Sequence, residues 1–211
     1  MSLFSPIQQS VTAPTRIHIE DLKAVNKFAA AFSENILKKE LNPDQSRVIV
    51  CIGTDRSTGD SLGPIVGSRL QEINHQYFKI LGTLQDPVHA GNLTEYLKIV
   101  DELANPFVIA IDACLGNIDN VGYINIGEGA LKPGAGVNKL LPPVGDLHIT
   151  GVVNVGGFME YFVLQNTRLN IVMKMSKIIS AGINQGSRLV AASGEPPAVK
   201  NEVSKRRTGF F

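Results

Sequence analysis

Two continuous apolar runs, each leading to an aspartate, restrict most strongly how this chain can fold. The first run is Val48–Gly53, and the second is Phe107–Ile111, which Asp112 follows directly. Short runs rich in β-branched residues and without polar alternation are typical of strands buried on both faces, as in parallel sheets covered by helices. The two runs therefore predict buried strands of a parallel sheet.

Amphipathic segments alternate with these strands along the chain. Apolar residues recur at steps of three and four over 20–39, which predicts a helix, and we expect further helices over 62–74, 93–103, 157–166 and 169–183. Further strands are expected over 78–84 and 121–126, and a connection rich in Gly and Pro over 127–145. This alternation predicts an α/β fold with a three-layer, doubly wound, mostly parallel sheet. We expect a single domain over 1–211, with loose arms at 1–18 and 191–211.

The composition limits the classes of partner. A net charge of +1, with 44% hydrophobic and 18% charged residues, indicates a globular protein and gives no basis for nucleic-acid or membrane binding. The chain shows neither a membrane-spanning apolar run nor a secretory signal, so we expect a cytoplasmic protein. The only two cysteines, Cys51 and Cys114, suit a reducing compartment and are expected to be buried structural thiols. A nucleophilic role for Cys114 stays open because it follows Asp112 closely.

Asp60 and Asp112 are the candidate catalytic residues. Functional residues in open parallel sheets gather where loops leave the carboxyl ends of strands, and both aspartates are expected at such exits. A charge placed directly after an apolar run is costly unless it has a partner, a cation or solvent. Two carboxylates held close together titrate as a pair, which suits acid/base work on water. The alternative is that Asp60 caps the next helix and Asp112 caps a turn.

His148 is the candidate third member of this site. We expect it to follow a long connection and to precede a helix, from where it could reach the aspartates and complete a divalent-metal site or accept a proton. A surface or capping role is the alternative, and His89 could line a loop near the site. The chain lacks the motifs of a P-loop, a dinucleotide fold, a serine-hydrolase elbow and a zinc protease, so we expect no organic cofactor.

The motifs around the two aspartates resemble those of known peptidases. Gly59-Asp60-Ser61-Leu62-Gly63-Pro64, together with Ile111-Asp112-Ala113, resembles the spore germination protease, which has an acidic residue before Leu-Gly-Pro and an aspartate in an Ile-Asp-Ala segment. The same layout is similar to that of the hydrogenase maturation endopeptidases. Over about residues 46–188 the chain looks closest to a small sporulation protein family of endospore-forming bacilli, the YyaC family.

The resemblance implies a phosphorylase/hydrolase-like fold of the hydrogenase maturation protease type, and cleavage of peptide bonds. It implies that Asp60 and Asp112 are catalytic, that the substrate is a spore protein or another developmental protein, and that the compartment is the mother cell or forespore. The maturation endopeptidases use a Glu, an Asp and a His to recognise a metal, which would correspond to Asp60, Asp112 and His148. Asp60 is one methylene shorter than the family's Glu, and this difference favours a metal-free aspartate pair.

Three functions stay open at this point. The first is a sporulation-associated peptidase with an aspartate pair, and the second is a non-catalytic binding or regulatory protein that retains the peptidase fold. The third, a metal-binding accessory protein, requires His148 beside the aspartates. Asp55, Arg56 and Asn154 are expected to support the site rather than to act in catalysis.

Overall fold

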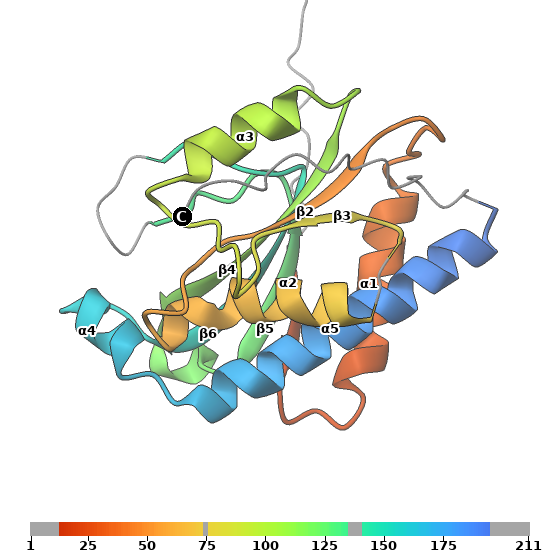
Figure 1. The fold of residues 1–211 in the computed structure, drawn as a ribbon. Helices are drawn as coiled ribbons and strands as arrows, with labels where there is room; N and C mark the ends of the chain where they lie inside the picture. The colour runs from red at the N-terminus through yellow and green to blue at the C-terminus, as the bar shows by residue number, and fades with distance from the viewer. Residues whose placement is uncertain (1–12, 74–75, 135–140, 195–211) are drawn as a thin grey trace, which may run out of the picture.

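A mixed sheet runs through the middle of the molecule in the computed structural model, which describes residues 13–73, 76–134 and 141–194 (Figure 1). Within these residues the sheet has six strands. In spatial order they are β1 (Thr15–His18), β5 (Tyr123–Glu128), β6 (Leu147–Val155), β4 (Phe107–Gly116), β2 (Arg47–Cys51) and β3 (Lys79–Leu81). Strands β3, β2, β4 and β6 pair in parallel, whereas β5 is antiparallel to both of its neighbours.

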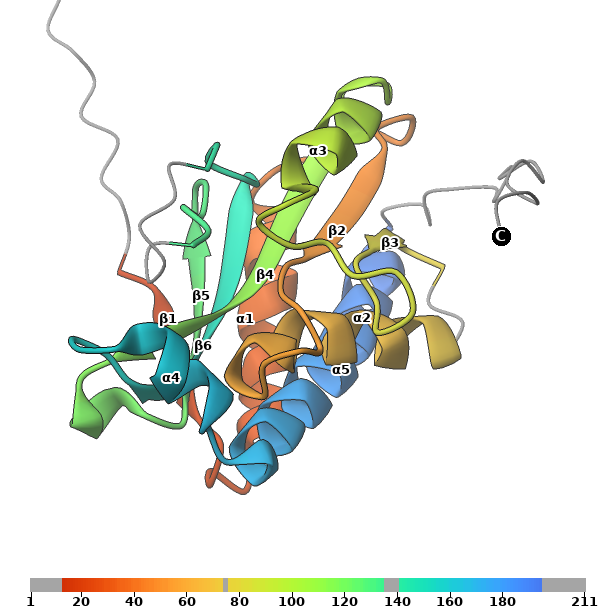
Figure 2. The same ribbon diagram turned by 60° about the vertical axis from the view of Figure 1, so that its left-hand side comes forward.

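Helices cover both faces of this sheet, so that the expected three layers are present (Figures 1 and 2). One face carries α1 (Ala24–Leu37), α2 (Leu62–Glu72) and the long α5 (Leu169–Ala192), which packs against the other two. The other face carries α3 (Leu93–Asp101). The short helix α4 (Glu160–Gln165) contacts β6 and the one-turn 3-10 helix η1 (Gly59–Ser61).

The central strands are buried on both faces because their side chains point alternately to two apolar cores. In β4, Ile109 and Ile111 belong to the core under α1, α2 and α5, whereas Val108 and Ala110 belong to the core under α3. Every residue of β2 is buried. Full burial of one such aliphatic side chain contributes about 1.5–3 kcal/mol, so these two strands anchor both layers. The predicted buried strands around Val48–Cys51 and Phe107–Ile111 are confirmed.

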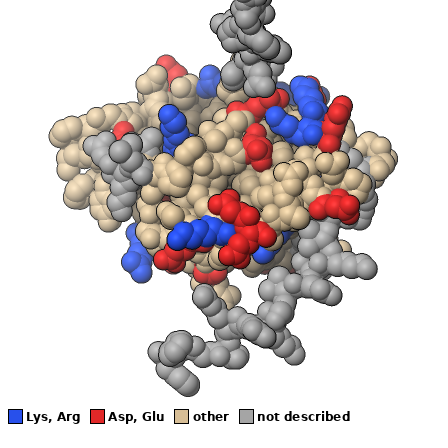
Figure 3. Space-filling view, turned by 90° about the horizontal axis from the view of Figure 1, so that it is seen from above, with Lys and Arg blue, Asp and Glu red and all other residues tan. Residues whose placement is uncertain are grey.

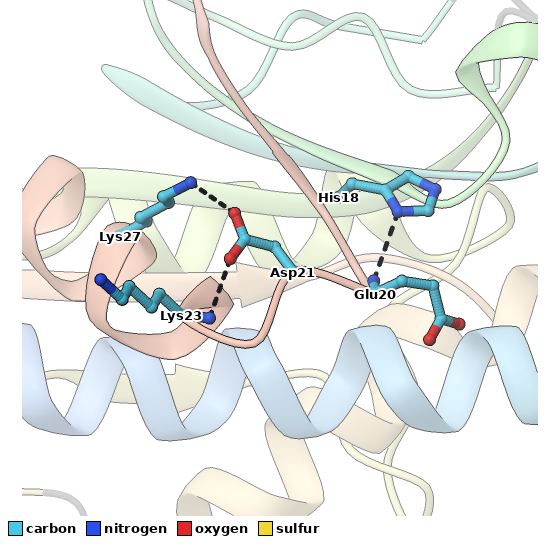
Figure 4. A network of polar contacts seen from close by, with 5 residues as sticks. All are labelled: His18, Glu20, Asp21, Lys23 and Lys27. Carbon is cyan, nitrogen blue, oxygen red and sulfur yellow. Dashed lines mark hydrogen bonds and ion pairs between the residues drawn. The ribbon is translucent and has the colours of Figure 1, made fainter.

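A small polar network marks the turn from β1 into α1 (Figure 4). Asp21 accepts a hydrogen bond of 2.8 Å from the backbone N–H of Lys23, and its other carboxylate oxygen pairs with the Lys27 ammonium group. The backbone N–H of Glu20 donates to Nδ1 of His18 at 3.3 Å. A carboxylate at a helix N-terminus is stabilised by the N–H groups exposed there, and Asp21 therefore helps to define where α1 begins.

Strand β6 is the main difference from the sequence-based expectation, which left residues 147–155 without a strand. Leu147, Ile149 and Val153 are fully buried, and β6 pairs with β4 on one side and β5 on the other. His148, Thr150 and Gly151 weaken the apolar pattern of the segment. Its strand conformation therefore depends on backbone pairing in the middle of the sheet, which local sequence does not reveal.

Other element boundaries shift by a few residues. Thr15–His18, assigned to the N-terminal arm, forms the edge strand β1, and α5 continues to Ala192. Strand β4 continues through Asp112 to Gly116 because it gains a pairing partner in β6. Most of the two predicted arms lies outside the described residues, as do the end of the helix predicted at 62–74 and part of the connection predicted at 127–145.

Charges of both signs are mixed on the face that carries α3. Figure 3 looks down on this face, and acidic and basic side chains lie next to one another among its described residues. The net charge of the whole chain is +1, and on this face the two signs are not separated into an acidic and a basic region. This side of the described structure offers no extended surface of a single sign.

The loop that follows β2 folds back on the end of its own strand, and two glycines allow this close approach. The backbone N–H of Thr54 donates to the carbonyl oxygen of Asp60 at 3.1 Å. A Cβ at Gly53, whose φ is +140°, would lie 1.9 Å from that same oxygen. A Cβ at Gly63 would lie 2.1 Å from the carbonyl oxygen of Ile52. Both positions therefore require glycine if Asp60 is to lie at the end of β2.

We expect Gly53→Ala to lower the free energy of unfolding by about 3 kcal/mol, because the new methyl group would overlap the Asp60 carbonyl in addition to straining the backbone. Gly157→Ala is the matched control. Its φ of +123° is also unfavourable for alanine, but no atom lies within 4 Å of the new Cβ, so a loss of only about 1 kcal/mol is expected. Urea unfolding followed by circular dichroism measures both, and equal losses would contradict the proposed close approach.

Candidate active site

Asp112 occupies the face of β4 that points toward the α3 side. Ala110 belongs to the core under α3, and residues two apart in a strand share a face, so Asp112 and Cys114 project to the same side. Strand β2 stops at Cys51, which pairs with Ile111. The Asp112 side chain therefore lies just beyond the end of β2, and only 7% of the residue is exposed.

Asp60 reaches the same place from the loop after β2. It lies in η1, between Gly59 and Ser61, and is only partly exposed. The Ser61 hydroxyl donates to the carbonyl oxygen of Thr58 at 2.7 Å, which tightens the turn. The two predicted catalytic residues thus come together because one strand ends where its neighbour continues.

Both aspartates line two adjoining cavities of about 240 and 430 Å³. The smaller cavity extends toward α4 and the segment 131–134. Its other lining residues are Ala113, Cys114, Leu115, Leu131, Lys132, Gly134, Glu160 and Leu164. The larger cavity extends toward the loop before α3, and its other lining residues include Thr54, Arg56, Ser57, His89, Gly91, Leu141, Tyr161 and Leu164. The described residues therefore leave an accessible space beside the carboxylates.

The environment raises the pKa of both carboxyl groups. Burial, reinforced by the negative charge of Asp60, raises the pKa of Asp112 well above its ordinary value, and a backbone hydrogen bond from Ala113 opposes this only in part. Burial also raises the pKa of Asp60, while a backbone hydrogen bond from Thr54 and the charge of His89 act to lower it. Because the charge of Asp60 favours the protonated form of Asp112, the arrangement is suited to hold a proton on one carboxyl group beside an ionised partner.

Cys114 also lines the smaller cavity, but as a protonated thiol. Burial raises the pKa of Cys114 to about 11, the charge of Asp112 adds to the effect, and a hydrogen bond with the Thr150 side chain opposes it. Burial likewise raises the pKa of Cys51, which is fully enclosed in the core. A nucleophilic cysteine requires a thiolate at neutral pH, so the environment of Cys114 favours the structural interpretation.

His148 lies apart from the two aspartates. It sits within β6 opposite Ala110, about 7 Å along the strands from the level of Asp112, and its Nδ1 lies 3.0 Å from the carbonyl oxygen of Gly129. It is absent from the lining of both aspartate cavities. Nowhere in the described residues do three or more His, Cys, Asp or Glu side chains gather closely enough to hold a metal ion. The donor set Asp60, Asp112 and His148 therefore does not fit a divalent-metal site.

The residues expected to support the site are distributed differently. Arg56 lines the larger cavity, whereas Asp55 lies in an exposed position outside both cavities. Asn154 donates to Oγ1 of Thr167 at 3.2 Å. A Cβ at Gly59 would lie 2.8 Å from that same oxygen, so the Asn154–Thr167 pair forms the surface against which the Asp60 turn packs.

Several cavity residues were not anticipated from the sequence. Lys132 comes from the Gly/Pro-rich connection, Glu160 and Tyr161 come from α4, and Ser57 comes from the loop before Asp60. These residues carry no motif, and Glu160 and Tyr161 line the cavities because α4 packs against η1. His89 was considered only as a residue near the site, and the structure places it in the larger cavity.

An exposed apolar rim is formed by α4 and the residues before it. It consists of Phe158, Met159, Tyr161 and Phe162, and Phe158 is 81% exposed. Tyr161 lines the larger aspartate cavity, whereas the other three line a separate hollow beside Asn154. Met159 adopts a φ of +48°, a left-handed conformation that costs a non-glycine residue on the order of 1–2 kcal/mol. Large exposed side chains grouped beside a cavity are typical of surfaces that bind another molecule.

Fold and site together define a class: an α/β protein with a mixed sheet between helices and two aspartates, one of them buried, beside shared cavities. The chain belongs to the family described as "Protein of unknown function (DUF1256)", whose model matches residues 16–182. It is 53% identical over 169 residues to "Uncharacterized protein YyaC" of Bacillus subtilis (strain 168), a match that covers 80% of this chain and 81% of the relative. Membership of the YyaC family is confirmed. Among the described helices, none has the length and apolar character needed to cross a bilayer.

The buried Asp112 carboxyl should make stability depend on pH. The folded protein holds its proton more tightly than the unfolded chain, in which the group titrates near 3.8, so this contribution to stability is lost as pH rises above that value. We expect Asp112→Asn to be more stable than the wild type at about pH 8, with the difference shrinking toward about pH 4. Urea unfolding across this range measures it. The exposed Asp119→Asn variant is the control, and a parallel pH dependence of wild type and Asp112→Asn would contradict the assignment.

Cys114 should react slowly with alkylating reagents. Its pKa of about 11, against an ordinary 9.0, leaves about a hundredfold less thiolate at neutral pH than an unperturbed thiol has. Iodoacetamide labelling of the native protein, followed by intact mass spectrometry, should be at least that much slower than labelling in urea. Rapid native labelling that Cys114→Ser abolishes would contradict this picture and restore the nucleophilic interpretation.

Proposed function

We propose that the protein is a peptidase that hydrolyses peptide bonds of a developmental protein during sporulation, with Asp60 and Asp112 as its catalytic residues. The observation that carries this proposal is the pair of cavities that Asp60 and Asp112 line together, where burial and then the charge of Asp60 raise the pKa of Asp112. One protonated and one ionised carboxyl group, placed side by side, supply a general acid and a general base at neutral pH.

The chemistry requires only water and the two carboxyl groups. The ionised carboxylate removes a proton from water while the oxygen attacks the scissile carbonyl carbon. The protonated partner donates a hydrogen bond to the carbonyl oxygen and stabilises the tetrahedral intermediate. When the intermediate collapses, the carbon–nitrogen bond breaks and the proton taken from water passes to the leaving amine.

The surroundings of the pair support a polypeptide substrate. Tyr161 lines the larger cavity, and the exposed Phe158 and Phe162 line a separate hollow formed by the same helix and the residues before it. A polypeptide could place its backbone beside the aspartates and its apolar side chains on this rim. A small polar metabolite would make no use of such a surface.

The proposal extends to the finer fold and to the place of action. Parallel strands with helices on both faces are compatible with a doubly wound, phosphorylase/hydrolase-like fold of the hydrogenase maturation protease type. The motif resemblance and the Bacillus relative support action in the cytoplasm of a mother cell or forespore. A spore protein is the substrate that this setting favours.

A second candidate function is a binding or regulatory protein that retains the fold without catalysis. The specific observation in its favour is the rim of α4, since exposed aromatic side chains can bind a partner without any chemistry. This function would be distinguished by a protein that the wild type binds without cleaving, and that no longer binds after substitution of the rim.

Incubation with proteins extracted from spores tests the peptidase. New N-termini identified by mass spectrometry should appear with the wild type, and Asp60→Asn or Asp112→Asn should reduce their rate of formation at least a hundredfold, since each removes one of the two proton-transfer groups. Asp55→Asn is the matched control, because it lies in the same loop but outside both cavities and should cleave normally. Equal cleavage by all four proteins, or cleavage by none, would remove the support for a peptidase.

A further inference from the structure

Ser57 is a buried residue in the wall of the candidate site. Only 7% of it is exposed, and it lines the larger cavity together with Asp60 and Asp112. It belongs to the loop after β2, which closes on itself where the backbone N–H of Thr54 donates to the carbonyl oxygen of Asp60 at 3.1 Å. Because this closure joins the two ends of the segment that contains Ser57, it holds the residue in the wall beside the aspartates.

The hydroxyl group of Ser57 has no hydrogen-bond partner among the residues that the structure describes, although its oxygen is enclosed. Ser61, Ser176 and Ser180, which are also buried, each donate to the carbonyl oxygen three residues earlier, at 2.7, 2.9 and 3.3 Å. A buried hydroxyl without a partner costs free energy, and native proteins contain few of them. The hydroxyl of Ser57 therefore points to a partner that comes from outside the chain.

Ser187 in α5 is the other serine of this kind in the described part of the chain. It is 4% exposed and lines neither of the two aspartate cavities. An unpaired hydroxyl alone therefore does not indicate a function. Ser57 differs because its unpaired hydroxyl belongs to the wall of a cavity that also contains the two candidate catalytic groups.

The larger cavity can accept a peptide backbone. Its volume is about 430 Å³, and its lining combines the two carboxyl groups with the apolar side chains of Leu141 and Leu164 and the ring of Tyr161. A hydroxyl group can donate to a carbonyl oxygen or accept from an N–H, and these two groups alternate along a peptide backbone. Rotation about χ1 gives a serine hydroxyl three staggered positions, so it can turn toward a group that enters the cavity.

We propose that Ser57 is a substrate-binding residue whose hydroxyl group forms a hydrogen bond with the backbone of a polypeptide, next to the bond that is cleaved. Its role in cleavage rests on the proposed peptidase function, whereas its binding of a peptide backbone does not. The hydrogen bond holds the peptide group beside Asp60 and Asp112, and it satisfies a hydroxyl that the free protein leaves unpaired. Ser57 transfers no proton in this scheme and acts by binding and orienting the peptide.

The first measurement asks whether the hydroxyl is unpaired in the free protein. Urea unfolding followed by circular dichroism compares the wild type with Ser57→Ala, Ser187→Ala and Ser61→Ala. We expect the first two variants to unfold at a higher urea concentration, because each loses an unpaired buried hydroxyl, and Ser61→Ala to unfold at a lower one, because it loses a hydrogen bond. A midpoint for Ser57→Ala equal to or below that of the wild type would overturn the proposal.

The second measurement is the binding of N-acetylleucine N-methylamide, which carries two peptide groups and one apolar side chain. In an NMR titration of the wild type, the amide signal of Ser57 should shift and reach saturation. The affinity should be about three- to tenfold weaker in Ser57→Ala, as expected for the loss of one neutral hydrogen bond. Ser187→Ala is the matched control and should bind as the wild type does, since it removes an unpaired hydroxyl outside the cavities.

Ser57→Cys provides a second variant of similar size, and it should also weaken binding because a thiol is a poor hydrogen-bond donor. Equal affinity of the wild type and both Ser57 variants, or the absence of a saturable shift at Ser57, would contradict the assignment.

Cleavage of spore proteins separates this proposal from the peptidase itself. If the wild type generates new N-termini, Ser57→Ala should generate them about three- to tenfold more slowly at substrate concentrations below KM, and Ser187→Ala at the normal rate. Normal cleavage by Ser57→Ala would remove the role of Ser57 and leave the peptidase standing. Absence of cleavage by the wild type, with the peptide probe bound through Ser57, would count against the peptidase alone.

Discussion

The offset between β2 and β4 is the constraint on which the site depends. Strand β2 stops after Cys51, while β4 continues through Asp112 because β6 supplies its next backbone partner. The chain leaving β2 must then turn within the space beside Asp112, and the loop folds back so that Thr54 binds the carbonyl oxygen of Asp60. One difference in strand length thus brings together two carboxyl groups that are far apart in the sequence.

Burial and charge act against each other at this place. Burial beside the apolar cores raises the free energy of the ionised form of each aspartate, and the pKa of both groups is raised as a result. Such an arrangement lowers stability at neutral pH and is sustained only because strongly packed strands lie beneath it. The raised pKa values that result from this burial also suit the pair to acid/base chemistry.

Three layers of contact surround the pair and could divide the work of a peptidase. The carboxyl groups lie at the floor of the cavities, the loop containing His89 borders them on the α3 side, and α4 provides an exposed apolar rim. The rim belongs to α4, whereas His89 belongs to the loop before α3, and Tyr161 and His89 line the same cavity.

Local sequence patterns were sufficient to predict most of the secondary structure of this protein. The apolar runs at Val48 and Phe107 and the helical periodicities depend on neighbours in the chain, and the structure agrees with them. Asp112 was expected at a strand exit but lies within β4, which continues to Gly116. Strand β6 could not be recognised in this way, because its conformation depends on pairing with β4 and β5. Tertiary structure alone decided which histidine lies near the site: strand register holds His148 away from Asp112, and the bridge between Ile52 and Val88 leaves His89 in the larger cavity. The sequence by itself determined which carboxyl groups meet, whereas long-range backbone pairing determined which histidine accompanies them.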